Sequence, residues 1–424
     1  MGSKTITTTL GEYLTFKNGK KSPDRDDNGC FNVFGSNGKI GKTHIANSDK
    51  NTIVIGRVGS YCGSVHFSDE KCWVTDNAIA CVAKSNEPAD FWFYLLGYLN
   101  LNQYRSGSGQ PLLNQSILNS IKCSIPSSIE SRAKIGHYLL SLDNKITLNC
   151  QVNQTLEQMA QVLFKSWFVD FDPVVDNALD AGFFEQDLAF PDELLSRAEA
   201  RRAVREHADF KPLPEATRQL FPAAFEECAE PSLGIGGWVP QGWQALQFGE
   251  FIHRKSVGKK YDQKSASAVG KIPILDQGKS GVIGYHDDEP GIRASLDSPV
   301  VVFANHTCYM RLISFDFSAI QNVLPFTGKD VDTTWAFYAT QDRVRFSEYK
   351  GHWPDFVIEK TIVPSLVLTT KFREDVDSLI RSVRCNELQN QTLINLRDTL
   401  LPKLISGELR LDNIEADLAN EGVA

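Results

Sequence analysis

The tetrapeptide NQTL occurs twice in this chain of 424 residues, at positions 153–156 and again at 390–393. Each copy lies in a long stretch with few breakers, in which apolar residues recur every seven positions. Such a repeat is the pattern of a coiled-coil seam, so the sequence predicts two long helices that pack through seams in the same phase. The seam positions are Ile135, Leu142, Asn149, Leu156 and Leu163 in the first helix, and Phe372, Leu379, Asn386, Leu393 and Leu400 in the second.

The shared asparagine step predicts a register for these helices. If a pseudo-two-fold axis relates them, they run antiparallel, and only the middle step of each seam faces its own equivalent. Asn149 and Asn386 are those middle steps, so we expect their side chains to be hydrogen-bonded to each other, with Ile135 facing the Leu400 end. A slipped register would bury each amide against an apolar side chain, at about 1–3 kcal/mol. The alternative is that both asparagines point to solvent.

The chain also matches itself outside the helices. The matching pairs are LGEY at 10–13 with FGEF at 248–251, GSNGKIG at 35–41 with GKSGVIG at 278–284, and FWFY at 91–94 with TWAFY at 334–338. The common glycines indicate tight turns. FGSNGKIGKT at 34–43 superficially suggests a phosphate-binding loop, but the first glycine of that motif would fall on Ser36, and the second copy lacks the lysine. The chain is therefore interpreted as a tandem repeat.

Each copy ends at a proline, Pro126 or Pro364, after which a long helix is predicted. We therefore expect an α+β fold in which two turn-rich globular domains are separated by two long antiparallel helices forming a coiled coil. The expected segments are a first domain at 1–125, a first helix at 126–171, an acidic connector at 172–240, a second domain at 241–363, a second helix at 364–410 and a tail at 411–424.

The connector contains a charged stretch, SRAEARRAVREHADF. Residues from Asp192 to His207 are expected to form a short solvated helix with Asp192 as its N-cap and Glu193 and Glu199 on its outer side. A charge run of this kind is usually a solvated surface, and the alternative is contact with a partner subunit.

The composition limits which partners and cellular locations the sequence allows. The net charge is −8, but residues 1–125 carry 13 Lys and Arg against 10 Asp and Glu, so the acidic connector does not exclude DNA as a partner. No apolar stretch is long enough to span a bilayer, and no secretory signal is evident, so we expect no membrane contact and a cytoplasmic location. Nine scattered cysteines indicate neither a zinc site nor a disulfide framework.

Catalytic motifs are not found. WPDFVIEK at 353–360 places Glu359 and Lys360 side by side, whereas a metal-dependent nuclease requires converging carboxylates. The serine-hydrolase, zinc-protease and deaminase motifs are absent, as are the cofactor loop and active-site strand of an adenine methyltransferase. Catalytic residues and metal ligands are therefore predicted to be none, and no cofactor is expected on this chain.

The features left to explain are polar loops with glycine turns. Their side chains are of the types that contact DNA bases. Arg and Lys can chelate guanine, Asn and Gln can chelate adenine, and Lys also binds phosphates. Any one of them taken alone is more simply a solvated surface residue. The candidates are Lys20, Lys21, Ser36, Asn37, Lys39, Lys42, Arg57, Tyr61, Arg105 and Gln110 in the first copy, and Arg254, Lys259, Lys260, Gln277, Lys279, His306, Arg311 and Lys350 in the second.

These residues carry a resemblance to the specificity subunits of type I restriction-modification systems. It covers nearly the whole chain. The strings that support it are GSNGKIG at 35–41 with IVIGRVGS at 53–60, SGSGQPLLNQS at 106–116 leading into IPSSIESRAKI at 125–135, LFKSWFVDFDPV at 163–174, and NQTLINLRDTLLPKLISGEL at 390–409.

The resemblance implies two target recognition domains, each reading one half of a split double-stranded DNA sequence, with helices that hold them apart. It also implies two modification subunits that dock on the helices and use S-adenosylmethionine, and motor subunits for restriction that use ATP and Mg²⁺. GRVGS at 56–60 is replaced by FANHT at 303–307 in the second copy, which predicts an asymmetric target. The alternative is a tandem scaffold or adhesion protein with a coiled-coil spacer. A single-chain enzyme is a third class, but it would need motifs that the sequence lacks.

Overall fold

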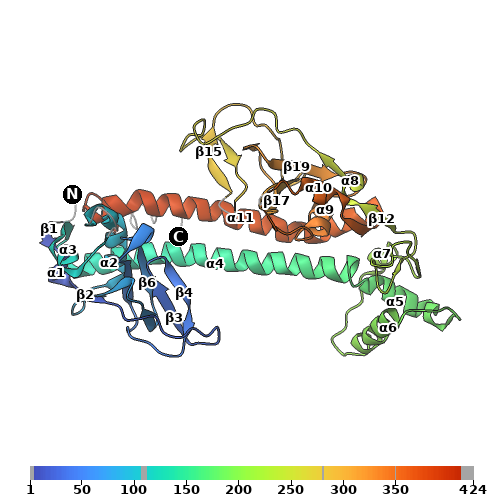
Figure 1. Ribbon diagram of the computed structural model, residues 1–424, viewed down its shortest axis with the longest axis horizontal. Coiled ribbons are helices and arrows are strands. Elements are labelled where there is room, and N and C mark those ends of the chain that lie inside the picture. The colour runs from blue at the N-terminus through green and yellow to red at the C-terminus, as the bar shows by residue number, and fades with distance from the viewer. Residues whose placement is uncertain (1–3, 107–111, 279–280, 349, 412–424) are drawn as a thin grey trace. The chain divides into compact units, whose positions relative to one another are not determined.

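The computed structural model describes residues 4–106, 112–278, 281–348 and 350–411. It contains two compact units, unit 1 (Met1–Cys150 with Glu387–Ala424) and unit 2 (Gln151–Asn386). The two long helices in Figure 1, α4 (Ile129–Phe168) and α11 (Leu366–Ile405), each have 40 residues and are divided between the units. Each unit therefore joins one globular domain to one part of both helices.

Unit 1 has two sheets and a short strand pair. The strands are β1 (Thr5–Thr9) paired with β9 (Lys122–Pro126), the sheet β2 (Leu14–Asn18), β8 (Ala78–Ala83), β5 (Thr52–Gly56) and β6 (Val65–Ser68), and the sheet β4 (Gly38–Thr43), β3 (Phe31–Gly35) and β7 (Cys72–Val74). All pairs are antiparallel except β3 with β7. The helices are α1 (Leu10–Tyr13), α2 (Ala89–Tyr98), α3 (Gln115–Ser120) and the three-residue η1 (Gly59–Tyr61) with η2 (Leu101–Tyr104).

Unit 2 repeats this topology. The strands are β12 (Gln244–Gln247) with β20 (Lys360–Val363), the sheet β13 (Ile252–Arg254), β19 (Val323–Gly328), β16 (Val300–Ala304) and β17 (Met310–Ile313), and the sheet β15 (Val282–His286), β14 (Ile272–Leu275) and β18 (Ser318–Ala319). Here β14 and β18 are the parallel pair. The helices are α8 (Phe248–Phe251), α9 (Thr333–Thr340) and α10 (Trp353–Ile358).

The central strand of each larger sheet is buried on both faces. In β5, Ile53 and Ile55 face the core formed with α2, whereas Val54 packs with Phe34 and Val74 of the second sheet. In β16, Val301 and Phe303 face the core of unit 2, and Val300 and Val302 face the second sheet. Successive side chains of a strand point to opposite faces, so both faces being covered explains the unbroken apolar runs TIVIG and VVVFA.

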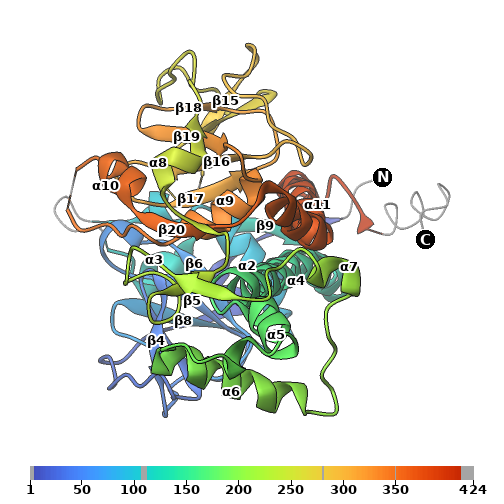
Figure 2. The same ribbon diagram turned by 90° about the vertical axis from the view of Figure 1, so that its right-hand side faces the viewer.

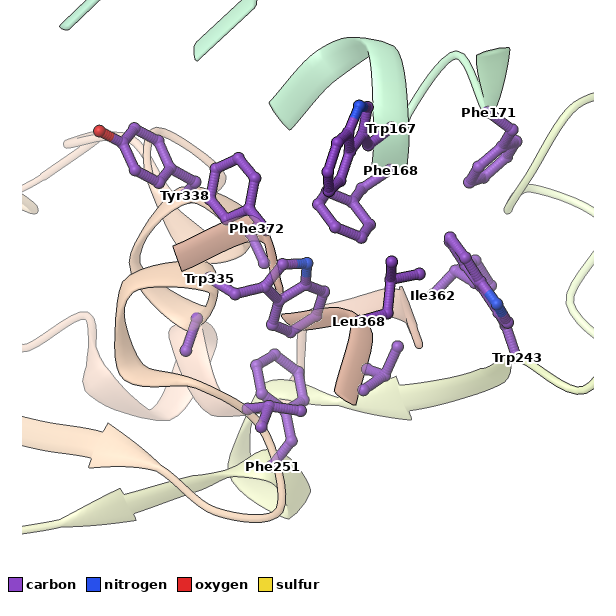
Figure 3. Packing of buried hydrophobic residues seen from close by; sticks show 14 of the residues in the cluster. Trp167, Phe168, Phe171, Trp243, Phe251, Trp335, Tyr338, Ile362, Leu368 and Phe372 are labelled. Atoms are coloured by element: carbon purple, nitrogen blue, oxygen red, sulfur yellow. The ribbon is translucent and has the colours of Figure 1, made fainter. Parts of the chain in front are cut away.

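Figure 3 shows the aromatic core of unit 2, where both long helices meet the globular domain. Phe168 near the end of α4 lies 5.4 Å from Phe372 of α11 and 5.9 Å from Trp335 of α9, measured between ring centroids. Trp167 and Trp335 are among the largest fully buried side chains of the described chain. Four aromatic side chains that bury this much surface anchor the helices to the domain.

The two helices run antiparallel in each unit, as predicted. In unit 1 Asp143 pairs with Arg397, and Asn149 pairs with Asn390. Residue numbers therefore decrease along α11 while they increase along α4. In unit 2 Asn386 bonds to Asn153, and the Phe164 ring lies 5.7 Å from that of Phe372, which gives the same direction. All ten predicted seam positions are buried or partly buried.

The amides of the seam bond to the asparagines of the two NQTL motifs. Asn149, 2% exposed, donates from Nδ2 to Oδ1 of Asn390 and to Oε1 of Gln389, both at 2.8 Å. Asn386 donates to Oδ1 of Asn153 at 2.8 Å. A direct Asn149–Asn386 bond would join the two units, and it stays a prediction. The first residue of NQTL is a register position that the heptad argument missed.

The connector folds as part of unit 2. Its elements are α5 (Asp172–Asp180), the short η3 (Phe183–Glu185), α6 (Asp192–Arg205), α7 (Glu215–Arg218), β10 (Phe225–Glu227) and β11 (Trp238–Pro240). The expected N-cap at Asp192 is wrong, because Pro191 is the N-cap and Asp192 begins the first turn. There its negative charge favours the helix N-terminus without capping it.

The charged run is less solvated than predicted. Successive carboxylates of α5 meet successive arginines of α6, so the two helices, side by side in Figure 2, run in the same direction. The Arg201 guanidinium makes two bonds to the Asp176 carboxylate, at 2.9 and 2.7 Å. The pairs are Asp172 with Arg197, Asp176 with Arg201, and Asp180 with Arg205. A bidentate pair of this kind fixes orientation as well as adding energy.

A half-buried carboxylate on α4 predicts a pH dependence for unit 2. Burial raises the pKa of Glu157 above its ordinary value of 4.5, and its Oε2 accepts a bond from the Tyr338 hydroxyl at 3.1 Å. Because the folded-state pKa is the higher one, this group's stabilisation is fully present below the ordinary pKa and is lost as pH rises through the raised value.

Glu157→Gln should therefore remove this loss while keeping an oxygen that can accept the Tyr338 bond. Urea unfolding between pH 4 and 8 should show a flatter profile for Glu157→Gln than for the natural chain, with the variant more stable at pH 8. An exposed carboxylate, Glu199→Gln, is the control and should leave the profile unchanged. Parallel profiles for all three chains would contradict the assignment.

Candidate nucleic-acid interface

Three loops of unit 1 are bonded into one surface, which we name loop face 1. They are the β3–β4 turn, the segment after β5 and the β7–β8 turn. The Ser36 hydroxyl donates to the carbonyl oxygen of Asn77, and the Ser64 hydroxyl donates to that of Ser36, both at 2.5 Å. The Arg57 backbone N–H also donates to the Asn77 carbonyl, at 2.9 Å. These bonds join loops that are far apart in sequence and hold them in fixed positions.

Loop face 1 contains four of the predicted residues, Ser36, Asn37, Arg57 and Tyr61, and Arg105 lies beside it. Asn37 and Arg105 are exposed, and Tyr61, in η1, is 52% exposed. Arg105 lies close enough to the loop after β5 to lower the pKa of the Cys62 thiol, although burial raises that pKa overall. Ser36 is different, because its hydroxyl is used within the fold. Exposed Asn, Tyr and Arg side chains on stiff loops are suited to contact bases and phosphates.

The predicted lysines of unit 1 lie beside this surface. Lys20 and Lys21 line a cavity of about 1160 Å³ with Arg25, and Lys39 and Lys42 are exposed on β4. The cavity also contains Asp24, Asp26 and Asp27, and the bond from His44 lowers the pKa of Asp26. Its charge is therefore mixed, so it suits a phosphate backbone less well than the adjoining loops. Gln110 lies outside the described residues.

The equivalent loops of unit 2 form loop face 2. The His306 backbone N–H donates to Oε1 of Gln277 at 3.0 Å, and its ring Nδ1 lies 2.8 Å from the Lys350 carbonyl oxygen. Gln277 lines a 330 Å³ cavity with Arg345 and the 56% exposed Phe346. The structure thus brings Gln277, His306 and Lys350 together. Lys279 lies outside the described residues.

Other predicted cations of unit 2 have partners within the fold. Arg311 donates to the carbonyl oxygen of Asp276 at 3.0 Å, and burial lowers its pKa, so it positions the β14–β15 turn. Lys259 pairs with Asp288 at 2.7 Å, which raises the lysine pKa. The pKa of Lys350 is raised by its bonds to Glu348 and Asp355.

The remaining two candidates of unit 2 lie at other points. Arg254 stacks over the Trp353 ring, with its guanidinium carbon 5.5 Å from the ring centroid. Lys260 is exposed beside a cavity of about 460 Å³ that Tyr261 and Ile320 also line. Arg345 and Phe346, which line the cavity beside Gln277, were not among the residues predicted from the sequence.

The described part of the chain holds no cluster of three His, Cys, Asp or Glu side chains arranged to bind a metal ion. Within the same residues, no helix combines the length and apolar character that a bilayer crossing requires.

Two versions of one loop surface, each built on the same strand topology, define a tandem recognition protein. Residues 4–158 match the family model of the type I restriction modification DNA specificity domain. Together with the similarities below, this match supports a specificity subunit of a type I restriction-modification system. Such subunits are non-catalytic parts of their systems, and the scaffold alternative is not favoured.

The chain is 28% identical over 363 residues to the type I restriction enzyme HindI specificity subunit of Haemophilus influenzae, covering 77% of this chain and 75% of that protein. It is 23% identical to the MjaIX specificity subunit of Methanocaldococcus jannaschii, covering 78% and 72%. The crystal structure of the S subunit from M. genitalium has the same fold, with a TM-score of 0.56 and 15% identity, and the match covers 95% of this chain and 96% of that one.

Proposed function

We propose that this chain selects the DNA sequence on which a type I restriction-modification complex acts. Loop face 1 reads one half of a bipartite double-stranded target, and loop face 2 reads the other half. The observation that carries the proposal is the recurrence of one loop surface on equivalent strands of both units with different side chains. Arg57 follows β5 in unit 1, whereas Asn305 and His306 follow β16 in unit 2. Identical surfaces would favour a palindrome, so unlike ones favour an asymmetric target.

The long helices supply a surface for the modification subunits. Three apolar side chains of α4 in unit 2, and a fourth on the residue directly after the helix, are exposed at heptad spacing, by 40–68% of their area. They are Val152, Met159, Val162 and Val169. A second apolar seam on a helix that already packs through a first one suits a partner helix. On this proposal S-adenosylmethionine is bound by two modification subunits, and ATP and Mg²⁺ by motor subunits, not by this chain.

An experiment can separate methyl transfer from DNA binding. The purified chain alone should transfer no labelled methyl group from S-adenosylmethionine to DNA, and transfer should appear when its modification subunits are added. The affinity of the complex for target duplex should fall steeply with salt, because phosphate contacts release counterions. Methyl transfer by the chain alone, or binding that does not depend on salt, would contradict the proposal.

The bipartite target is tested by selection from a random duplex library. Sequences retained by the assembled complex should contain two specific blocks separated by a fixed number of unspecified base pairs. Replacing residues 1–125 with those of a related subunit should change one block and leave the other. A single block, or changes in both blocks, would overturn the division of labour between the loop faces.

A further inference from the structure

Arg57 is a half-buried cation without a counter-ion. Its side chain makes one long bond, from Nη1 to the carbonyl oxygen of Asp76 at 3.4 Å, and its buried Nε has no partner. Among the described residues, no carboxylate lies within ion-pair distance of it. Partly buried charges in proteins are normally paired. The acceptor that Arg57 lacks is therefore expected from outside the chain.

Other partly buried arginines of the described chain show the contrast. Arg132 donates to Glu87 and to two carbonyl oxygens, and Arg201 and Arg397 each have carboxylate partners. Tertiary structure accounts for the position of these arginines. It does not account for the guanidinium of Arg57, whose contact with Asp76 is at the limit of a hydrogen bond.

The backbone around Arg57 is held on several sides. Its N–H donates to the carbonyl oxygen of Asn77 at 2.9 Å, and its carbonyl accepts from the N–H of Leu113 at 3.0 Å. The next residue, Val58, forms a bridge with Leu112. With the backbone fixed and Nε buried, the side chain loses little further freedom when Nη1 and Nη2 bind a ligand. Groups that read bases need this preorganisation.

The polar side chains of the β3–β4 turn and of the segment after β5 that neighbour Arg57 carry no charge. The hydroxyls of Ser36 and Ser64 are both used to bond backbone carbonyls, so they stiffen loop face 1 without reading it. Asn37 is exposed beside them but carries no charge. A fixed guanidinium fork matches the O6 and N7 acceptors of guanine in the major groove.

We infer that Arg57 reads a guanine in the half of the target contacted by unit 1. The inference rests on the proposed function and names the base that this part of the site takes. Unit 2 has Asn305 and His306 at the equivalent loop, and Asn305 is occupied by a bond from the Trp353 N–H. The requirement for guanine at this step is therefore specific to the block read by unit 1.

The test uses the full chain assembled with the modification subunits of its system and a random duplex library. The natural complex should require one G·C pair in the block that changes when residues 1–125 are replaced. Arg57→Ala should relax that pair by roughly 10- to 100-fold and leave every other position of both blocks intact. Arg57→Lys should relax it too, because lysine keeps the charge but not the fork. The control, Arg25→Ala, removes an exposed arginine that lines the mixed-charge cavity and should leave the selected sequence unchanged.

Two results would overturn the inference while leaving the proposed function in place. One is a uniform loss of affinity in Arg57→Ala with a salt slope smaller by about one, which would mark a phosphate contact. The other is a block of unit 1 without a required G·C pair. Selection of no bipartite sequence by the natural complex would overturn the proposed function itself, and the inference with it. Thermal unfolding of both Arg57 variants should match that of the natural chain, since no internal ion pair is lost.

Discussion

Replacing Arg132 with Met should lower the free energy of unfolding of unit 1 by about 3–5 kcal/mol, because it leaves a buried carboxylate without its cation. Arg132 is 3% exposed, and its Nη2 lies 2.5 Å from Oε1 of Glu87. It also donates to the carbonyl oxygens of Pro126 and Ser127, and its guanidinium carbon lies 5.4 Å from the Tyr13 ring centroid. One side chain thus joins the start of α4 to the globular domain. Urea denaturation of the full chain measures the change.

Two further variants test whether the loss of stability comes from breaking the buried Arg132–Glu87 pair. Glu87→Gln added to Arg132→Met should recover part of the loss, because the neutral amide has no unpaired charge to bury. Arg293→Met removes an exposed pair with Glu289, whose side chains are 79% and 87% exposed, and should change stability by only a few tenths of a kcal/mol. Equal losses for Arg132→Met and Arg293→Met would show that the buried pair has no special role.

Lengthening both long helices should move the two halves of the DNA target apart. Inserting four residues after Gln154 and four after Gln391 adds about 6 Å to each helix, close to two base pairs at about 3.4 Å per pair. Four residues exceed one helical turn by only about 40°, so the buried faces stay nearly in phase. Binding to the natural target should fall roughly a hundredfold or more, since only one half can then be matched.

Selection with the lengthened chain should recover the same two blocks with a spacer about two base pairs longer. Insertion in α4 alone is the matched control. It should destabilise the chain instead of giving a new spacer, because contacts before the insertion, such as Asn149 with Asn390, and contacts after it, such as Phe164 with Phe372, could no longer form together. An unchanged spacer in the doubly lengthened chain would contradict the role of the helices as a ruler.

Local pattern was sufficient for the two long helices. The seam from Ile135 to Leu163 is a period that only a helix satisfies. Long-range pairing was beyond such reasoning. The arginines of α6 look like a solvated surface until α5 places three carboxylates opposite them.

The candidate interface was also only partly predictable from the sequence. Residue types selected loops that the fold brings together, since Asn37, Arg57 and Tyr61 lie on one surface. Types could not show that the Ser36 hydroxyl is used by Asn77, 41 residues away, or that Arg311 supports a turn from beneath. A side chain that is free to contact DNA and one that is bonded within the fold look the same in the sequence. Which of the two it is depends on its partners, and these are set by the sheet topology.

The composition of unit 1 has a consequence for protein synthesis. Its core contains Leu400, Leu404 and Ile405, which are translated only after the whole of unit 2. At about 5–20 residues per second, the N-terminal domain waits on the order of 10–50 s for these side chains. A message cut between residues 387 and 399 would encode a complete unit 2 beside a unit 1 with an open apolar surface, which chaperones and proteases recognise. Because of this order of translation, a correctly folded first domain indicates that the chain has been synthesised through α11.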